Sequence, residues 1–144
     1  KLVNLKRERP EYKNLKYKKI LSYLFKMDNS KSDICLVSNK KLLETGTSNI
    51  LFIKDNKVFT PKKNYYEGNT YKYFKSKIKG IIKKDVLLKE IKNYDEILLI
   101  GSGKGVTSVK TIKQIGWKRK NLNQFRNFSK QYRLAINNCN LYKF

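Results

Sequence analysis

The chain has 144 residues, which is enough for one domain with its own hydrophobic core. It carries 34 Lys plus Arg against 11 Asp plus Glu, a formal net charge of +23, and it contains no His. Without His, neither a Ser-His-Asp triad nor a Cys-His pair can form. The two cysteines cannot build a structural zinc site without His.

The spacing of apolar residues predicts three helices. Residues 15–27 place their apolar side chains on one stripe, as an amphipathic helix does. A second helix of about three turns is expected to begin with Asn69 or Thr70 as its N-cap. Residues 122–136 form the third predicted helix. Its expected buried face consists of Leu122, Phe125, Tyr132 and Ile136.

Short apolar runs between turn residues predict the strands. They are expected at residues 2–5, 34–38, 42–44, 49–53, 57–60, 86–88 and 96–100. The pairs Asn39-Lys40 and Asp55-Asn56 are typical of hairpin tips, so the strands on either side of them should be antiparallel. The sequence therefore predicts a mixed α/β domain over residues 1–144, with mostly antiparallel strands and flanking helices.

The strong positive charge permits two interpretations. It is typical of proteins that bind nucleic acid or an anionic surface. It also accompanies an excess of Lys, Asn, Ile, Tyr and Phe, the residues of AT-rich codons, and the basic residues are spread along the whole chain. Cys35 and Cys139 are expected to be free thiols. No apolar run has transmembrane length, so we expect a cytoplasmic protein without membrane contact.

A glycine-rich turn, Gly101-Ser102-Gly103-Lys104-Gly105, follows the apolar run 97–100. It is not a Walker A loop, because Leu98 stands where that motif requires Gly. It is not a dinucleotide-binding fingerprint either, because its sixth position is Val106. Two interpretations remain: exposed backbone N–H groups that hold a phosphate, or a tight turn that needs positive φ angles.

One carboxylate stands among small and hydroxyl-bearing residues in Glu44-Thr45-Gly46-Thr47-Ser48-Asn49, just before an apolar strand. Three other segments accompany it in a fixed order. They are Pro10-Glu11-Tyr12-Lys13-Asn14-Leu15, then Val58-Phe59-Thr60-Pro61 with Gly68-Asn69-Thr70, and finally Asp95-Glu96-Ile97-Leu98-Leu99-Ile100-Gly101-Ser102. Together the four segments resemble the fold-type IV pyridoxal-phosphate enzymes, the class IV aminotransferase family, and most of all its aminodeoxychorismate lyases.

This resemblance implies pyridoxal 5'-phosphate as the cofactor. It assigns the Schiff-base lysine to Lys13 and the carboxylate that keeps the pyridine nitrogen protonated to Glu44. Such a lysine needs a pKa lowered inside a pocket. The other cofactor-binding residues that the resemblance implies are Ser48, Asn49, Gly68, Asn69, Thr70, Gly101 and Ser102. For Asn49 a structural role in tying backbone segments together is the alternative, and for Thr70 a plain N-cap.

The resemblance covers only the larger C-terminal domain of such an enzyme, so the smaller N-terminal domain is expected to be missing from these residues. It implies a homodimer that acts on a small amino substrate. By this resemblance, the sequence Gly-Lys-Gly-Val-Thr-Ser at residues 103–108 favours a lyase that releases pyruvate from 4-amino-4-deoxychorismate and forms 4-aminobenzoate for folate synthesis. A branched-chain or D-amino-acid aminotransferase is the alternative, and a basic nucleic-acid-binding module without catalysis is a third possibility.

Overall fold

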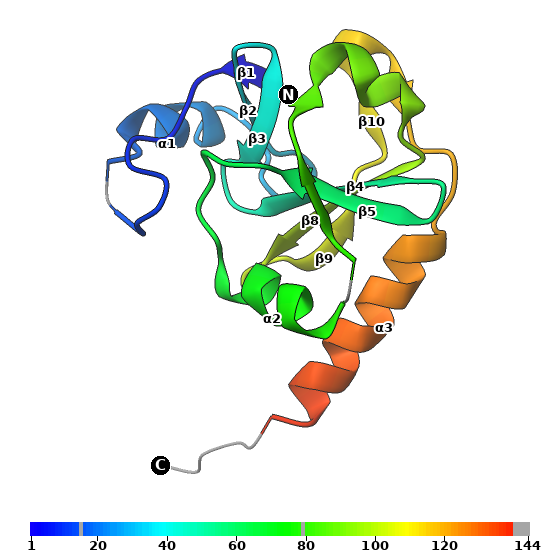
Figure 1. Ribbon diagram of the computed structural model, residues 1–144. Helices are drawn as coiled ribbons and strands as arrows, with labels where there is room; N and C mark the ends of the chain where they lie inside the picture. The colour runs from blue at the N-terminus through cyan, green and yellow to red at the C-terminus, as the bar shows by residue number, and fades with distance from the viewer. Residues whose placement is uncertain (15, 79, 140–144) are drawn as a thin grey trace, which may run out of the picture.

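Short strands with apolar residues build two sheets that pack against each other in the computed structural model, which describes residues 1–14, 16–78 and 80–139 (Figure 1). The first sheet, in the order β1-β2-β3-β7, consists of β1 (Leu2–Asn4), β2 (Cys35–Ser38), β3 (Lys41–Thr45) and β7 (Val86–Leu87). The second, in the order β6-β5-β4-β8-β9, consists of β4 (Asn49–Lys54), β5 (Lys57–Pro61), β6 (Ile82–Lys84), β8 (Glu96–Gly101) and β9 (Gly105–Ser108). A separate pair is formed by β10 (Thr111–Ile112) and β11 (Trp117–Lys118).

Antiparallel pairing dominates both sheets, as the hairpin signals predict. Asn39, Lys40, Asp55 and Asn56 all have positive φ angles, which the tight turns β2–β3 and β4–β5 require. Parallel pairing is described for β1 with β2 and for β5 with β6. The mixed α/β fold class with mostly antiparallel strands is therefore confirmed.

Three α-helices flank the sheets: α1 (Lys18–Leu24), α2 (Asn69–Lys77) and α3 (Asn123–Asn137). Two short 3₁₀ helices lie in connections, at Leu88–Asn93 and Lys113–Ile115. The first helix begins later than predicted, and Leu15, its predicted first residue, lies outside the described residues. The carboxylate of Glu96 on β8 accepts hydrogen bonds from the first-turn N–H groups of Gln124 (2.8 Å) and Phe125 (2.9 Å), so a buried acid stabilises the start of α3.

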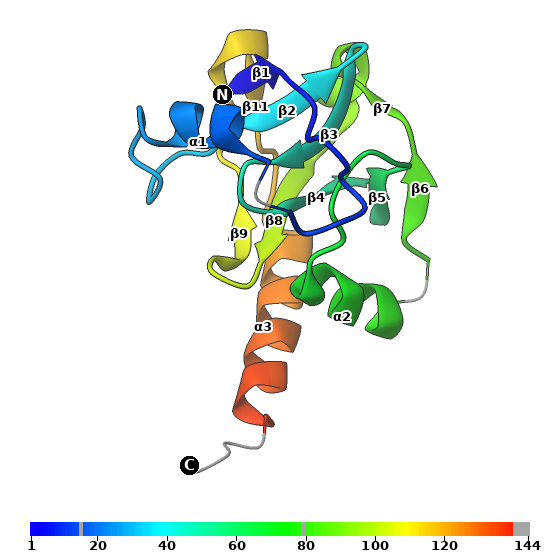
Figure 2. The same cartoon turned by 90° about the vertical axis from the view of Figure 1, so that its left-hand side faces the viewer.

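The hydrophobic core has three parts. The first lies between the two sheets and includes Phe52, Leu99 and Trp117. The second lies between the second sheet and the helices α2 and α3, which Figures 1 and 2 show on the side of β8 and β9. The third packs α1 against β1 and β2. Because both faces of β4 and β8 are covered, their side chains are buried almost without interruption.

Two sequence predictions about the helices are wrong. Ile136 was expected on the buried face of α3 but is 51% exposed, whereas Phe128 is buried against Phe74. The end of α3 extends beyond the body of the domain formed by the other described elements, which agrees with this exposure (Figure 2). The N-cap of α2 is Gly68 rather than Asn69 or Thr70, and it makes no side-chain capping bond.

The two thiols are both free, as expected, and we predict that they differ in reactivity. Burial raises the pKa of Cys35 to about 12, whereas Cys139 is exposed. Because the thiolate is the reactive form, a disulfide reagent should modify Cys139 at least about tenfold faster than Cys35. A Cys139→Ser variant should lose the fast phase, and similar rates for both thiols would contradict the packing around β2.

Within the described ranges 1–14, 16–78 and 80–139, no helix is long and apolar enough to cross a lipid bilayer.

Candidate cofactor site

Glu44 is a buried acid at the end of β3. Its side chain is 4% exposed, and its Oε1 lies 2.7 Å from Nε of Arg7. The other oxygen, Oε2, accepts a longer bond of 3.4 Å from the backbone N–H of Tyr66. Burial raises the pKa of Glu44, while the hydrogen bond and positive charge of Arg7 act in the opposite direction. Arg7 is therefore the group that favours the ionised carboxylate in this buried position.

The turn after Glu44 is closed by the hydroxyl of Thr45. Its Oγ1 accepts hydrogen bonds from the backbone N–H groups of Ser48 (2.8 Å) and Thr47 (3.3 Å). The Thr45 backbone N–H also donates to the carbonyl oxygen of Ser48 at 2.9 Å. This short turn carries the chain from the first sheet to the second, and it fixes the orientation of Glu44 relative to Asn49.

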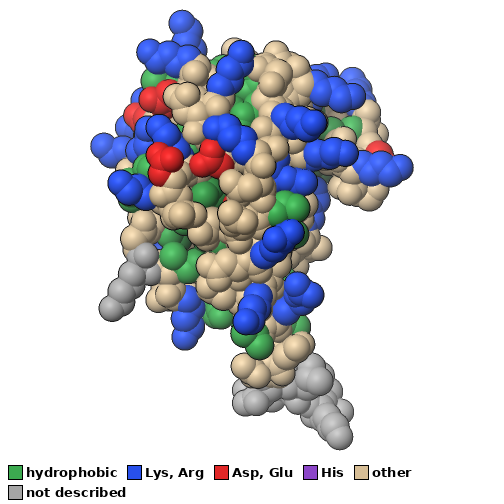
Figure 3. Space-filling view, turned by 90° about the vertical axis from the view of Figure 1, so that its right-hand side faces the viewer, with side chains coloured by type: hydrophobic (Ala, Val, Ile, Leu, Met, Phe, Trp, Pro, Cys, Tyr) green, Lys and Arg blue, Asp and Glu red, His purple; other side chains and the backbone are tan. Residues whose placement is uncertain are grey.

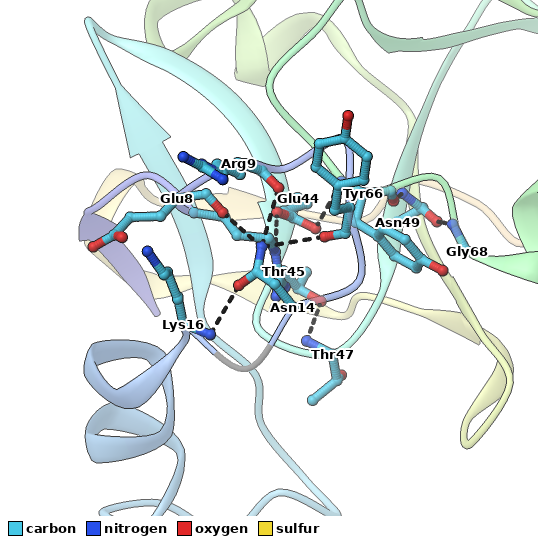
Figure 4. Close-up of polar contacts among 12 residues, drawn as sticks. Glu8, Arg9, Asn14, Lys16, Glu44, Thr45, Thr47, Asn49, Tyr66 and Gly68 are labelled. Carbon is cyan, nitrogen blue, oxygen red and sulfur yellow. Dashed lines mark hydrogen bonds and ion pairs between the residues drawn. The ribbon is translucent and has the colours of Figure 1, made fainter.

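Asn49 joins the first residue of β4 to the start of α2. Its Nδ2 donates to the carbonyl oxygen of Tyr66 at 2.6 Å, and its Oδ1 accepts from the N–H of Gly68 at 3.0 Å (Figure 4). A Cβ atom on Gly68 would lie 3.2 Å from the same Oδ1, so the contact is close. The structural role considered for Asn49 is thus present: it holds the N-terminus of α2 beside the turn after Glu44.

Gly101 brings the glycine-rich turn against Ser48. A Cβ atom on Gly101 would lie 2.8 Å from Oγ of Ser48 and 3.1 Å from the carbonyl oxygen of Thr47. The turn joins β8 to β9 as an antiparallel hairpin, and Gly105 in it has φ +63°. The glycine-rich segment therefore forms a tight turn that uses a positive φ angle, as one of the two interpretations predicts. Ser102 is exposed at the tip of this turn.

We predict that Gly101→Ala destabilises the protein by about 1–2 kcal/mol, because the new methyl group collides with Ser48 and with the backbone of Thr47. Gly103→Ala is the matched control, since a Cβ atom there meets nothing within 4 Å. Urea unfolding should show a change within about 0.5 kcal/mol for the control. Equal effects of the two substitutions would contradict the close approach of the two turns.

Lys13 lies in an exposed position in the loop before α1. The loop is organised by the next residue, Asn14, whose Nδ2 lies 3.0 Å from the carbonyl oxygen of Glu8 and 3.1 Å from that of Arg9. The Oδ1 of Asn14 accepts from the N–H of Lys16 at 2.8 Å (Figure 4). This side chain thus holds the backbone on both sides of Lys13.

The structure brings most of the predicted site residues together through a chain of contacts. Glu44 and Asn49 both contact the backbone of Tyr66, Asn49 contacts Gly68, and Ser48 meets Gly101. Thr70 is buried in the first turn of α2. No hydrogen bond or ion pair joins Lys13 to these residues within the described parts of the chain. No cluster of metal-ligating side chains occurs in those parts either.

Sequence reasoning missed Arg7 and Tyr66. Arg7 lies 37 positions before Glu44, so only folding reveals their contact. A weak signal existed, because Arg7 is one of only five arginines in a lysine-rich chain, and Arg is the preferred partner of a buried carboxylate. Tyr66 contributes backbone groups alone, which no side-chain pattern can indicate.

Residues 1–112 match the model of the family described as amino-transferase class IV. The chain belongs to this family. The match includes the turn after Glu44, the start of α2 and the glycine-rich turn. A comparison with curated protein sequences finds no match.

Solved class IV structures share the fold. A branched-chain aminotransferase from Thermobaculum terrenum in its pyridoxal-phosphate form aligns with TM-score 0.73 and 19% identity over 93% of this chain and 47% of that one. A 4-amino-4-deoxychorismate lyase from Pseudomonas aeruginosa aligns with TM-score 0.64 and 18% identity over 81% and 45%. A branched-chain aminotransferase from Thermoproteus uzoniensis with norvaline aligns with TM-score 0.63 and 19% identity over 72% and 37%. This chain spans less than half the length of each of these three proteins.

Proposed function

We propose that residues 1–144 are the cofactor-binding domain of a pyridoxal-phosphate-dependent class IV enzyme. The observation that carries this proposal is the buried carboxylate of Glu44 with Arg7 at 2.7 Å. A carboxylate is the partner that a protonated pyridine nitrogen requires, and Arg7 favours the ionised form of Glu44 against the burial that raises its pKa. Membership in the class IV family and the shared fold of the holo Thermobaculum terrenum enzyme support the same cofactor.

The residues around Glu44 fit such a group. The second carboxylate oxygen of Glu44 makes only one long bond, so it can accept a further donor. Gly101 leaves no room for a side chain and Gly68 leaves little, so the backbone at both positions carries no bulk that would keep a flat ligand away. The start of α2 and the exposed tip of the glycine-rich turn both carry backbone N–H groups of the kind that bind phosphate. When bound, pyridoxal phosphate supplies an electron sink for carbanion chemistry.

In this arrangement the chain's own residues have distinct roles. Glu44 holds the proton on the pyridine nitrogen, and Arg7 opposes the protonation of Glu44. Lys13 is the covalent attachment point and moves protons at the substrate carbon. Thr70 and Ser102 bind the phosphate with the adjoining N–H groups, while Ser48 and Asn49 orient the turns that carry them. The remaining proposed cofactor-binding residues are Gly68, Asn69 and Gly101, and they contribute backbone groups to the site.

The test is a titration of the chain with pyridoxal phosphate followed by absorption spectroscopy. We expect a visible band from a protein-bound Schiff base, which borohydride reduction should fix covalently at one lysine identified by peptide mapping. Saturable binding with attachment at Lys13 supports the proposal. Labelling of many lysines without saturation, in a chain that includes the family's N-terminal domain, would contradict the proposal of a cofactor-binding domain.

For the reaction, we propose release of pyruvate from 4-amino-4-deoxychorismate to give 4-aminobenzoate. The amino-acid sequence of residues 103–108 supports this lyase activity, and the solved structures that share this fold include such a lyase. Branched-chain aminotransferases are neighbours as well, which keeps amino transfer as the second candidate. Formation of 4-aminobenzoate supports the lyase, whereas amine transfer to 2-oxoglutarate without that product supports the aminotransferase.

A further inference from the structure

A cavity of about 730 Å³ lies beside the core between the two sheets, and its lining includes Thr45 and Lys104, which belong to the turns that carry the proposed cofactor residues. It is bounded by β1, by the segment before β2 and by residues 107–114 around β9 and β10. Lys13, Glu44, Ser48, Asn49, Gly68–Thr70 and Gly101–Ser102 are all absent from its lining. Its volume falls in the range of about 300–1,000 Å³ that small-molecule sites occupy.

The floor of this cavity is apolar. Leu42, Ile50, Phe52, Ile97 and Leu99 of the core cluster between the sheets lie at its base and are 0–7% exposed. The apolar surface that is open to a ligand is that of the half-buried side chains Leu2, Met27, Cys35, Val109 and Ile112. An apolar wall without partner atoms forfeits its dispersion contacts, so an apolar body of suitable size would gain them on binding. The floor therefore favours a hydrocarbon or aromatic group over a fully polar ligand.

The rim of the cavity is positively charged. Five lysines line it, namely Lys1, Lys31, Lys104, Lys110 and Lys113, and Asp33 is the single acid among the lining residues. The carboxylate of Asp33 is already engaged, because it lies 3.1 Å from Nζ of Lys104 and accepts the Thr47 hydroxyl at 2.6 Å. Its side chain is only 6% exposed.

The positive excess extends across the surrounding surface. No Asp or Glu occurs in the sequence after Glu96, so β9, β10, β11, α3 and their connections contain no acids, while β11, α3 and the connections carry Lys and Arg. Figure 3 shows the side of the molecule on which β10 and α3 lie, with Lys and Arg far outnumbering acidic side chains. A concave site with one sign of charge at its mouth concentrates ligands of the opposite sign.

From the apolar floor and the lysine rim together, we infer that this cavity binds a small organic anion with an apolar body. Its carboxylate or sulfonate group lies among Lys1, Lys110 and Lys113, and its apolar part lies against the half-buried Leu2, Met27, Val109 and Ile112. None of the proposed cofactor residues lines this site, and the inference does not depend on the proposed function. Lys13→Ala is therefore expected to leave its affinity unchanged.

Trp117, the single tryptophan, reports on this site because it belongs to the same core cluster as the floor and is 3% exposed. Decanoate is the probe, with decanol and decylammonium as neutral and cationic analogues of equal chain length. We expect decanoate to change the emission of Trp117 saturably, with an affinity at least about tenfold higher than that of either analogue. Equal affinity for decanol and decanoate would overturn the inference, as would a lack of saturable binding.

Charge reversal locates the anion. The double variant Lys110→Glu/Lys113→Glu should bind decanoate at least about tenfold more weakly. Lys89→Glu/Lys92→Glu is the matched control, since it changes the net charge equally at two exposed lysines outside the lining. Equal losses in both double variants would show a response to net charge alone and contradict a built site.

A second variant tests the apolar floor without changing charge. Val109 is half-buried on the cavity wall, so Val109→Phe should fill part of the volume and weaken decanoate at least about tenfold. An unchanged far-UV circular dichroism spectrum and unchanged Trp117 emission of the free protein would confirm that the variant folds. Undiminished decanoate affinity in a folded Val109→Phe protein would contradict the assignment of the apolar body to this cavity.

Discussion

Replacing Lys13 by Ala is expected to abolish the visible absorption band that pyridoxal phosphate produces with the wild-type chain. The band requires a Schiff base between the cofactor aldehyde and one lysine amine, and Ala offers no amine. The loss should be complete, whereas noncovalent contacts of the phosphate and the pyridine nitrogen persist. Absorption spectra and the mass of the borohydride-reduced protein measure the difference.

Lys16→Ala is the control for this experiment. Lys16 is exposed in the same loop, and its contribution to the loop is a backbone N–H bond to Asn14, which Ala retains. The Lys16→Ala protein should therefore show the same band as wild type. A band that survives Lys13→Ala but disappears with Lys16→Ala would move the attachment point to Lys16.

Replacing Arg7 by Met is expected to destabilise the folded protein by about 3 kcal/mol near neutral pH. The substitution leaves the Glu44 carboxylate buried without its cation, and uncompensated buried charges are costly. The packing of Arg7 over the ring of Tyr17, at 5.9 Å to its centroid, is preserved in part by the similar length of Met. Urea unfolding monitored at Trp117 gives the magnitude.

The effect of Arg7→Met should depend on pH in a defined direction. With Arg7 gone, only the weaker hydrogen bond from the Tyr66 N–H still opposes burial, so the pKa of Glu44 rises further above its ordinary value of 4.5. A raised pKa means that the folded state binds more protons than the unfolded state, so stability falls as pH rises through the folded pKa. The deficit relative to wild type should therefore shrink towards about pH 4.5 and be largest above the folded pKa.

Arg9→Met is the matched control for the ion pair. Arg9 is exposed, and the contact described for it is made by its backbone oxygen to Asn14, so its side chain should matter little. A change within about 0.5 kcal/mol that does not vary with pH is expected. A pH-independent loss of the same size in both variants would contradict the role of Arg7 as the partner of Glu44.

Much of the fold could be predicted because the signals are local. The hairpin tips at Asn39-Lys40 and Asp55-Asn56 were predicted from residue type, because Asn and Asp tolerate the left-handed backbone that tight turns need. The apolar run at residues 97–100 predicted a buried strand, and the structure has β8 there. The N-cap of α2 could not be predicted in the same way, because Asn49, nineteen positions earlier, supplies the acceptor for Gly68.

The sequence alone determined the mixed fold, the resemblance to class IV enzymes and the choice of Glu44 as the central acid, because each depends on residue type and short spacing. Tertiary structure decided what surrounds that acid. Arg7 reaches Glu44 across 37 positions, Gly101 meets Ser48 from the end of the neighbouring strand β8, and the lysine-rimmed cavity forms between segments distant in sequence. Such contacts depend on how the two sheets pack, and side-chain packing is a property of the assembled core that no local pattern contains.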